Sequence, residues 1–249
     1  MVSGKYSALS GAITREQNMA NVSANLANVS TIGYKKARMS FEAMLRGERQ
    51  TDETKGINYN RVRGNFTDFS QGPLKETANP FDLAINGNGF FKIRTPEGDL
   101  LTRKGNFVVG QDGRLLSENG MPVLGAGDGE IIIDRVDITK ISIDADGFVY
   151  TVDENGETTT IAQLAVVDVT DRSLLRRQGE TAFSQEPGAL EIPAVDFSIA
   201  QGSLEVSNVN MTNEMTKMLY DNRLFQAYHN VLEGYSRLGE KLEELGTLA

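Results

Sequence analysis

The sequence predicts an α+β protein in which N- and C-terminal helices form a coiled-coil-like core and a central, mostly antiparallel β region is inserted between them. Two observations support this fold class. Near both ends of the 249-residue chain, apolar residues recur at spacings of three and four, which is the period of an amphipathic helix. In the middle, Thr-, Val- and Ile-rich segments alternate with Asn-Gly and Asp-Gly dipeptides, which is typical of strands joined by tight turns.

Residues 3–32 are predicted to form the first helix, and Gly33 is expected to end it. One apolar stripe on this helix, interrupted only by Arg15, contains Ala8, Ala12, Met19, Val22, Leu26 and Val29. A second stripe, offset by about 100° around the axis, contains Tyr6, Leu9, Ile13, Ala20 and Ala27 and is interrupted by Glu16 and Ser23. A helix with two adjacent apolar stripes needs neighbours on two sides.

The central region is expected to consist of short strands. They are predicted at residues 89–94, 115–117, 131–133, 140–143, 148–152 and 163–168. Turns are predicted at Asp112-Gly113, Asn119-Gly120, Asp128-Gly129, Asp146-Gly147 and Asn155-Gly156. Asn and Asp tolerate a positive φ and Gly accepts it freely, so these dipeptides favour hairpins.

Residues 209–246 are predicted to form a second, longer helix. Its unbroken heptad stripe contains Leu224, Tyr228, Val231, Tyr235, Leu238, Leu242 and Leu245. An adjacent stripe contains Met211, Met215, Met218, Phe225 and Leu232. Asn208, Asn210 and Thr212 can cap the start, where Glu214 complements the helix dipole. The alternative interpretation is that both helices simply cover a globular core.

The order of these elements predicts a domain organisation. Residues 1–33 and 208–249 would form a helical core domain, residues 77–184 a β-rich domain, and residues 34–76 and 185–207 extended connectors. Because the helices lie at opposite ends of the sequence, burying their stripes requires that the termini come together. With only two helices per chain, the remaining partners are most simply other copies of the same protein.

Composition excludes several classes of function. The chain has no cysteine and a single histidine, which excludes disulfides, thiolate catalysis and Cys- or His-rich metal sites. A net charge of −9 makes it a poor nucleic-acid binder. The charge is uneven: residues 1–65 carry 10 Lys/Arg against 5 Asp/Glu, an asymmetry that suits stacking of copies. An acidic β region without such a role is the alternative.

Motifs for enzymes or cofactors are weak. The glycines at 87 and 89 resemble part of a dinucleotide fingerprint, but the third glycine is missing and a strand follows. The segment 144–147 begins like a calcium loop, but Val149 and Asn155 stand where Gly and Glu are required. Asp134 and Asp137 are interpreted as solvated turn charges, and His229 as a packing residue. We therefore expect no enzyme activity, cofactor, metal or small-molecule substrate.

No long apolar segment indicates a membrane span or a cleaved signal peptide. The sequence therefore predicts either a cytoplasmic location or export by a route without a cleaved signal.

Near the end of the first helix, Asn25 and Asn28 are three residues apart and share one face. Their amides can bond exposed carbonyls or set the register between neighbouring helices; two solvent-facing asparagines are the alternative.

The segment 23–35, with its Asn-Leu-Ala-Asn core and Gly-Tyr exit, resembles the signature of the flagellar rod and hook family of axial proteins. Further resemblance lies in residues 79–91, 101–107 and 201–210. Tyr34 departs from the commoner Phe, and residues 224–229 lack the basic-aromatic pair that is frequent in the family. The length and residues 6–12 most resemble a proximal rod member, with a distal rod member as the alternative.

This resemblance implies a structural subunit that polymerises helically into the hollow shaft of the basal body, crosses the periplasm, transmits torque and conducts exported subunits. Its implied partners are copies of itself, neighbouring rod proteins and the flagellar type III export apparatus. The expected assembly interface comprises Leu9, Ile13, Met19, Val22, Asn25, Leu26, Asn28, Val29, Leu224, Tyr228, Val231, Tyr235, Leu238, Leu242 and Leu245. A β-rich binding module oligomerised by its helices is the alternative from another class.

Overall fold

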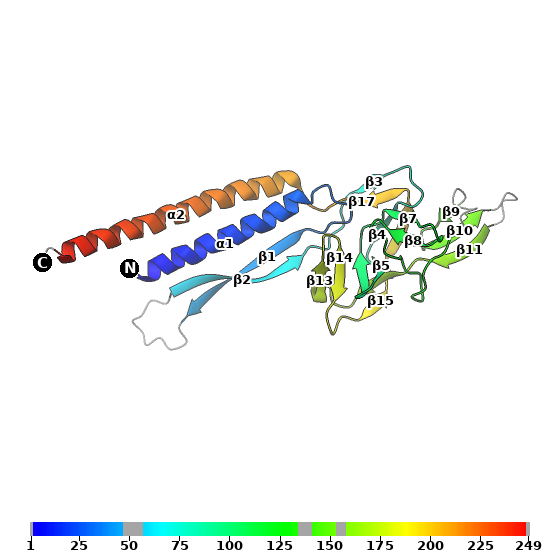
Figure 1. Ribbon diagram of the computed structural model, residues 1–249, viewed down its shortest axis with the longest axis horizontal. Coiled ribbons are helices and arrows are strands. Elements are labelled where there is room, and N and C mark those ends of the chain that lie inside the picture. Colours follow the sequence, from blue (N-terminus) through cyan, green and yellow to red (C-terminus); the bar gives the residue numbers. More distant parts are fainter. Residues whose placement is uncertain (1, 47–56, 134–140, 153–157, 248–249) are drawn as a thin grey trace. The chain divides into compact units, whose positions relative to one another are not determined.

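The computed structural model describes residues 2–46, 57–133, 141–152 and 158–247 (Figure 1). Helix α1 (Val2–Ala27) and helix α2 (Met211–Thr247) flank a central antiparallel β region, which confirms the predicted α+β class. The chain divides into two compact units. We call them the helical unit (Met1–Asn28, Lys36–Asp68 and Val209–Ala249) and the β unit (Val29–Lys35 and Phe69–Asn208).

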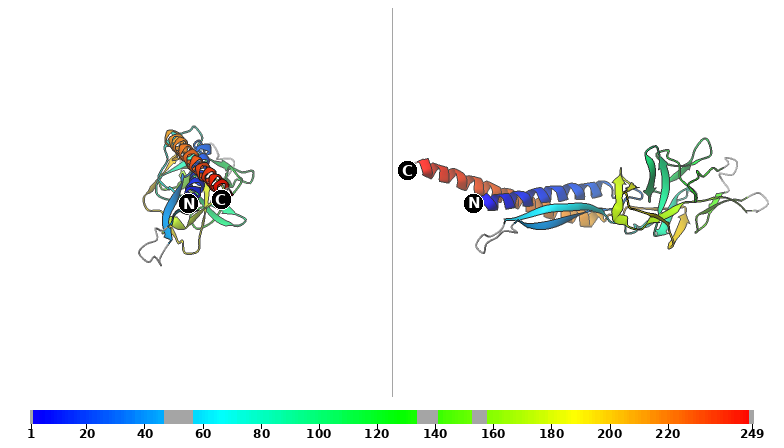
Figure 2. Two further views of the ribbon diagram at one scale, coloured as in Figure 1. Left: turned by 90° about the vertical axis from the view of Figure 1, so that its left-hand side faces the viewer. Right: turned by 90° about the horizontal axis from the view of Figure 1, so that it is seen from below.

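In the helical unit, α1 and α2 lie side by side and run in opposite directions (Figures 1 and 2). The antiparallel strands β1 (Ala37–Arg46) and β2 (Ile57–Thr67) form a hairpin that packs along α1. Residues 34–76, expected as an extended connector, therefore contain a hairpin that belongs with the helices. This hairpin was not predicted because no Asn-Gly or Asp-Gly dipeptide marks the connection between the two strands.

Helix α1 ends at Ala27, five residues before the predicted end at 32. The Asn28 backbone N–H is shared between the carbonyls of Ala24, at 3.3 Å, and Asn25, at 3.2 Å, which tightens the last turn. Gly33, the predicted helix terminator, does have a φ of 70° but lies beyond the helix. A Cβ there would lie 2.5 Å from the backbone nitrogen of Lys104, so the close approach also requires glycine.

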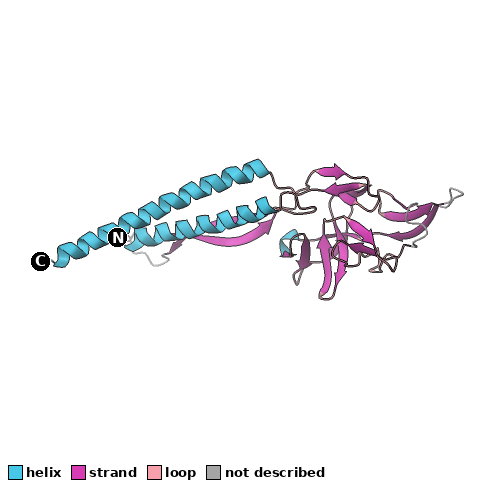
Figure 3. Cartoon of the chain, turned by 45° about the horizontal axis from the view of Figure 1, so that its top comes forward, coloured by secondary structure: helices cyan, strands magenta, loops and turns pink. Residues whose placement is uncertain are grey.

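Over its described residues, the β unit contains short strands and the 3₁₀ turn Arg172–Leu174 (Figure 3). Its six-stranded sheet has the order β13 (Leu175–Gln178), β14 (Ala182–Gln185), β6 (Gly98–Thr102), β5 (Phe90–Thr95), β12 (Val166–Val169) and β15 (Glu191–Pro193). A three-stranded sheet has the order β11 (Thr158–Gln163), β10 (Phe148–Val152) and β9 (Ile141–Ile143). Three further pairs are β16 (Phe197–Gln201) with β4 (Leu83–Gly87), β17 (Ser203–Glu205) with β3 (Leu74–Glu76), and β7 (Phe107–Val109) with β8 (Leu115–Ser117).

Several predicted strands agree with these bounds. The predictions at 115–117 and 148–152 are confirmed, and those at 89–94 and 140–143 are confirmed within one residue at each end. The segment 163–168 instead straddles β11 and β12. Residues 131–133 form only an isolated bridge, yet Ile131 and Ile133 are buried in the core. The expected connector 185–207 contains β15, β16 and β17, because its residues pair with strands far earlier in the chain.

The predicted turns position the hairpins of the β unit. Asp112-Gly113 joins β7 to β8 and Asp146-Gly147 joins β9 to β10. At the predicted Asp128-Gly129 turn, the residues with positive φ are Gly127 and Asp128, so the turn is displaced by one residue toward the N-terminus. Asn155-Gly156 lies outside the described residues. The main core under these hairpins includes Leu83, Phe91, Phe107, Val123, Val149 and Leu164.

Candidate assembly surface on the helical unit

The first apolar stripe of α1 faces the inside of the helical unit. Ala8, Ala12 and Val22 are buried, while Met19 and Leu26 are half-buried. Small residues on this face allow α2 to approach closely. Arg15, the one break in the stripe, forms an ion pair with the buried Asp221, with 2.9 Å between Arg15 Nη1 and Asp221 Oδ1. The break in apolar periodicity therefore marks a charge pair between the helices.

The second stripe of α1 faces outward. Tyr6, Leu9 and Ile13 are 52%, 42% and 46% exposed, and Ala20 and Ala27 are exposed as well. Isolated surface hydrophobics are ordinary, but Tyr6, Leu9 and Ile13 repeat along one helix face and form a patch that ends at the exposed Glu16. Such a patch is typical of an interaction surface.

The heptad stripe of α2 is only partly covered. Leu224, Tyr228 and Tyr235 are half-buried, whereas Val231 and Leu238 are exposed. The side chains of Leu242 and Leu245 lie outside the described residues. In the adjacent stripe, the side chains of Met211, Met215 and Met218 are exposed, and Phe225 and Leu232 are half-buried. Within the described chain, α2 thus offers apolar surface along much of its length.

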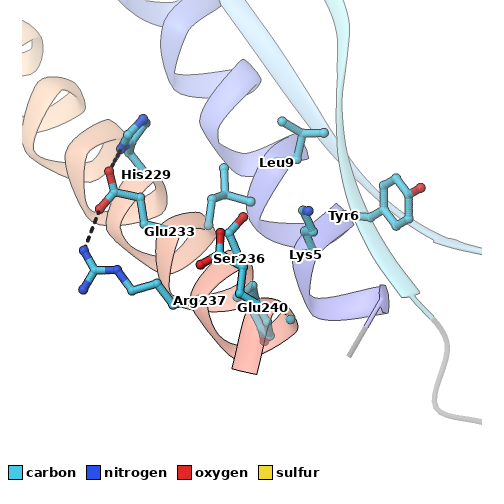
Figure 4. Close-up of a pocket in the computed structure, with 11 residues that line it drawn as sticks. Lys5, Tyr6, Leu9, His229, Glu233, Ser236, Arg237 and Glu240 are labelled. Carbon is cyan, nitrogen blue, oxygen red and sulfur yellow. Dashed lines mark ion pairs between the residues drawn. The ribbon is translucent and has the colours of Figure 1, made fainter. Parts of the chain in front are cut away.

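A groove of about 840 Å³ lies between the N-terminal part of α1 and the C-terminal part of α2 (Figure 4). Its apolar lining comes from Tyr6, Leu9, Leu232 and Tyr235. The rim is polar and includes Lys5, His229, Glu233, Ser236, Arg237 and Glu240. Glu233 holds two of these side chains, with 3.4 Å to His229 Nδ1 and 3.8 Å to Arg237 Nη2. An apolar floor with a charged rim suits the docking of another amphipathic helix.

Asn25 is buried and bonded inside its own chain. Its Nδ2 donates to the Ala37 carbonyl at 2.9 Å, and its Oδ1 accepts from the Ala37 backbone N–H at 2.9 Å. The same Nδ2 lies 3.3 Å from Glu214 Oε2 on α2. Asn28 is half-buried, and its Nδ2 donates to the Ala24 carbonyl at 2.9 Å. Asn25 therefore connects α1 with β1 and α2. Asn28 bonds a carbonyl at the end of α1.

Glu214 is almost fully buried beneath two lysines. Lys36 Nζ lies 2.5 Å and Lys217 Nζ lies 3.0 Å from Glu214 Oε1. Burial alone raises the pKa of the Glu214 carboxyl, but the hydrogen bonds from Lys36 and Lys217 outweigh it and lower the pKa below its ordinary value. Glu214 is therefore charged in the folded protein at neutral pH. From the sequence only its effect on the helix dipole was predicted, and its contact with Asn25 was missed.

In the β unit, the segments that lead from α1 and toward α2 meet at Glu205. Its carboxylate accepts from Lys35 Nζ at 2.6 Å, from the Gly72 backbone N–H at 2.8 Å and from Arg103 Nη1 at 3.1 Å. Its backbone carbonyl accepts from the Gly33 N–H at 2.8 Å. Val29, which was predicted to lie on the first stripe, belongs to this unit and is half-buried. The basic residues Lys35 and Arg103 and the acidic Glu205 are far apart in the sequence, and no local pattern predicts that they pair.

No group of three or more His, Asp or Glu side chains among the described residues could hold a metal ion. Neither helix, over its described residues, is long and apolar enough to cross a membrane.

Three family models match separate parts of the chain. Residues 6–35 match the flagella basal body rod protein model, which covers most of α1 and the segment after it. Residues 84–151 match the D1 domain of the flagellar hook protein FlgE/F/G, and residues 200–245 match the C-terminal region of the basal body rod FlgEFG proteins. These ranges overlap the motifs on which the sequence resemblance was based.

Known relatives agree over nearly the full length. The basal-body rod protein FlgF of Caulobacter vibrioides is 29% identical over 245 residues, covering 98% of both chains. FlgG of Bacillus subtilis is 29% identical over 263 residues, covering 98% of this chain and 99% of its own. FlgF of Mesorhizobium japonicum is 32% identical over 225 residues, covering 89% of this chain and 88% of its own. The chain belongs to the flagellar basal-body rod protein family.

Proposed function

We propose that this protein is a structural subunit of the flagellar rod that polymerises helically into a hollow shaft, transmitting torque and conducting exported subunits. The main observation that supports this proposal is the outward stripe of Tyr6, Leu9 and Ile13 beside the groove between α1 and α2. A rod subunit requires such a surface, because each copy must bind neighbours through the same faces.

In the assembled rod, α1 and α2 of neighbouring copies, or of neighbouring rod proteins, would pack against this stripe and groove. The result would be the coiled-coil-like core expected from the heptad spacing of α2. Burial of apolar side chains from water would drive each contact. Close packing of many such contacts would give the shaft its torsional stiffness.

We further propose that this rod subunit is the proximal rod protein, FlgF, rather than the distal rod protein, FlgG. FlgF relatives in Caulobacter vibrioides and Mesorhizobium japonicum support it, and FlgG of Bacillus subtilis supports the distal alternative. Cryo-electron tomography of basal bodies that carry a tagged copy would discriminate between them. A tag near the inner-membrane end of the rod is expected, and a tag near the hook would favour the FlgG alternative.

We also propose that the subunit reaches the periplasm through the flagellar type III apparatus, with no signal peptide removed. Residues 6–35, which match the rod family, would then be present in the assembled protein. Mass spectrometry of the subunit from purified basal bodies is expected to detect peptides that begin at residue 1 or 2. A mature N-terminus after residue 15 would contradict this route.

A charge on the outward stripe tests the proposed assembly surface. Leu9→Asp is expected to abolish swimming and to remove the subunit from purified basal bodies, in cells whose own copy of the gene has been deleted. The control is Val108→Asp in β7, because Val108 is 48% exposed, close to the 42% of Leu9. Both variants should keep the circular dichroism of the parent. Normal rods with Leu9→Asp would overturn the proposed surface.

A further inference from the structure

Four positions on α1, each seven residues apart, face four positions on α2 with the same spacing in the opposite direction. The facing pairs are Gly4 with Tyr235, Gly11 with Tyr228, Asn18 with Asp221, and Asn25 with Glu214. We call this set the ladder and each pair a rung. Two rungs of glycine with tyrosine come first along α1, and two rungs of amide with carboxylate follow.

The glycine rungs are defined by shape. A Cβ on Gly11 would lie 2.6 Å from Tyr228 Cζ and 2.7 Å from Tyr228 Cε1, which is closer than atoms can approach. A Cβ on Gly4 would likewise overlap the Tyr235 hydroxyl group. Each tyrosine ring therefore occupies the space beside a glycine, and a larger residue there would require the ring to shift.

The amide rungs are defined by charge. Asn18 Nδ2 donates to Asp221 Oδ2 at 2.5 Å, and Arg15 binds the other oxygen of the same carboxylate. Asn25 Nδ2 lies 3.3 Å from Glu214 Oε2, while Lys36 binds Glu214 Oε1. Both carboxylates are buried, and in the observed register each has an amide and a cation beside it.

Apolar packing by itself does not determine how far α2 slides along α1. Among the described side chains of α2, only Glu214 and Asp221 are buried, and both are acidic. On α1, the buried apolar residues are small or β-branched: Ala8, Ala12 and Val22. The α2 side chains with the strictest positional requirement are thus the ladder residues.

We propose that the ladder sets the register in which α1 and α2 pair and excludes the registers one heptad away. A slip in one direction would place Asp221 opposite Gly11 and leave its carboxylate without an amide. A slip in the other direction would place the Tyr228 ring against Asn18. Such a slip moves one helix by about 10 Å, since each helical residue rises about 1.5 Å. The slip would also move the α1 residues that line the groove, Tyr6 and Leu9, away from the α2 residues that line it, Leu232 and Tyr235.

Cysteine cross-linking measures the register directly, because the chain has no cysteine of its own. Ala8 and Val231 line the same small pocket, so Ala8→Cys with Val231→Cys reports the observed register. Ala8→Cys with Leu224→Cys, and Ala8→Cys with Leu238→Cys, report slips of one heptad in the two directions. Oxidation of the parent chain is expected to cross-link only the first pair efficiently.

Exchanging two rungs on α2 tests the ladder. The double change Asp221→Tyr with Tyr228→Asp is expected to lower the yield of the 8–231 cross-link by about tenfold, because it buries a carboxylate opposite Gly11. The compensating exchange Gly11→Asn with Asn18→Gly on α1 should restore most of that yield. Arg15 lies within one helical turn of both positions and can pair with the carboxylate in either arrangement.

The matched control exchanges two exposed residues with the same spacing on α2, Arg223→Asn with Asn230→Arg, and should leave the yield unchanged. A parental yield from the α2 exchange alone would overturn the proposal. A loss that the compensating exchange does not restore would also overturn it, since that loss would reflect general destabilisation. The proposal concerns the free chain and does not depend on rod assembly. A failed cross-linking test would therefore leave the proposed rod function standing, and a failed motility test would leave the proposed register standing.

Discussion

Lys35 and Glu205 form a buried ion pair, with 2.6 Å between Lys35 Nζ and Glu205 Oε1 and with side chains 1% and 0% exposed. Arg103 shares the same carboxylate at 3.1 Å. Lys35 follows α1 in the sequence and Glu205 precedes α2, so one carboxylate ties together the two segments that lead to the helices.

Removing this carboxylate should destabilise the β unit strongly. Glu205→Gln removes the charged carboxylate that Lys35 and Arg103 share, and we expect the free energy of unfolding to fall by about 3–5 kcal/mol. Urea unfolding followed by circular dichroism measures it. The control is Glu186→Gln, which breaks the exposed Arg176–Glu186 pair, where about 0–1 kcal/mol is expected. Similar losses in both variants would show that burial of the Glu205 pair has no special importance.

Glycine-to-alanine changes at two helical positions should have opposite signs. A Cβ at Gly234 in α2 would meet only open space, so Gly234→Ala should stabilise the helical unit by up to about 1 kcal/mol through helix propensity. Gly11→Ala should destabilise it, because the new methyl group overlaps the Tyr228 ring. Thermal unfolding at 222 nm measures both. A stabilising Gly11→Ala would mean that the ring moves aside freely.

Acid should weaken the helical unit through Glu214. Its pKa is lowered in the folded state, so the unfolded chain binds more protons as pH falls toward the ordinary value of 4.5. The contribution of Glu214 to stability is therefore present above that pH and is lost as pH falls through the lower, folded pKa. Glu214→Gln should flatten the pH dependence of unfolding in this range. The exposed Glu243→Gln is the control and should keep the parental slope.

Leu238→Asp should separate folding from assembly. Leu238 is 52% exposed, so the free energy of unfolding of the isolated chain should change by no more than about 0.5 kcal/mol. In cells, we expect loss of motility, because the proposed rod contact would have to bury the new charge. Motility at the parental level would place this face of α2 outside the rod contacts.

The two asparagines at the end of α1 should differ in importance. Asn25→Leu removes both bonds to the Ala37 backbone. The Ala37 carbonyl keeps the bond from Asn21 Nδ2 at 3.2 Å, so the loss falls on the Ala37 N–H and should cost about 1–3 kcal/mol. Asn28→Leu removes the bond to the Ala24 carbonyl at a half-buried position, and we expect it to change stability by less than about 1 kcal/mol. Thermal unfolding of the two variants compares them. Equal effects would show that the Ala37 contact contributes little.

Much of the architecture was predictable because it depends on local patterns. The stripes of α1 and α2 follow from residues three or four apart, and the hairpin turns at 112–113 and 146–147 from the φ values that Asp and Gly accept. The rod-family motifs are also contiguous segments, so they could be read without coordinates. Candidate surface residues such as Leu9 and Ile13 emerged from the same periodicity, although periodicity alone does not distinguish an exposed stripe from a buried one.

Local patterns in the sequence are enough to locate the two helices, the turns at 112–113 and 146–147 and the family motifs, because these properties involve neighbours along the chain. Tertiary structure alone decided that the stripe of Tyr6 and Leu9 faces outward. It also decided that β1 and β2 pack against α1, and that Arg15 meets Asp221. These features depend on contacts between residues far apart in the chain, whose free energies arise only when packing brings the side chains together.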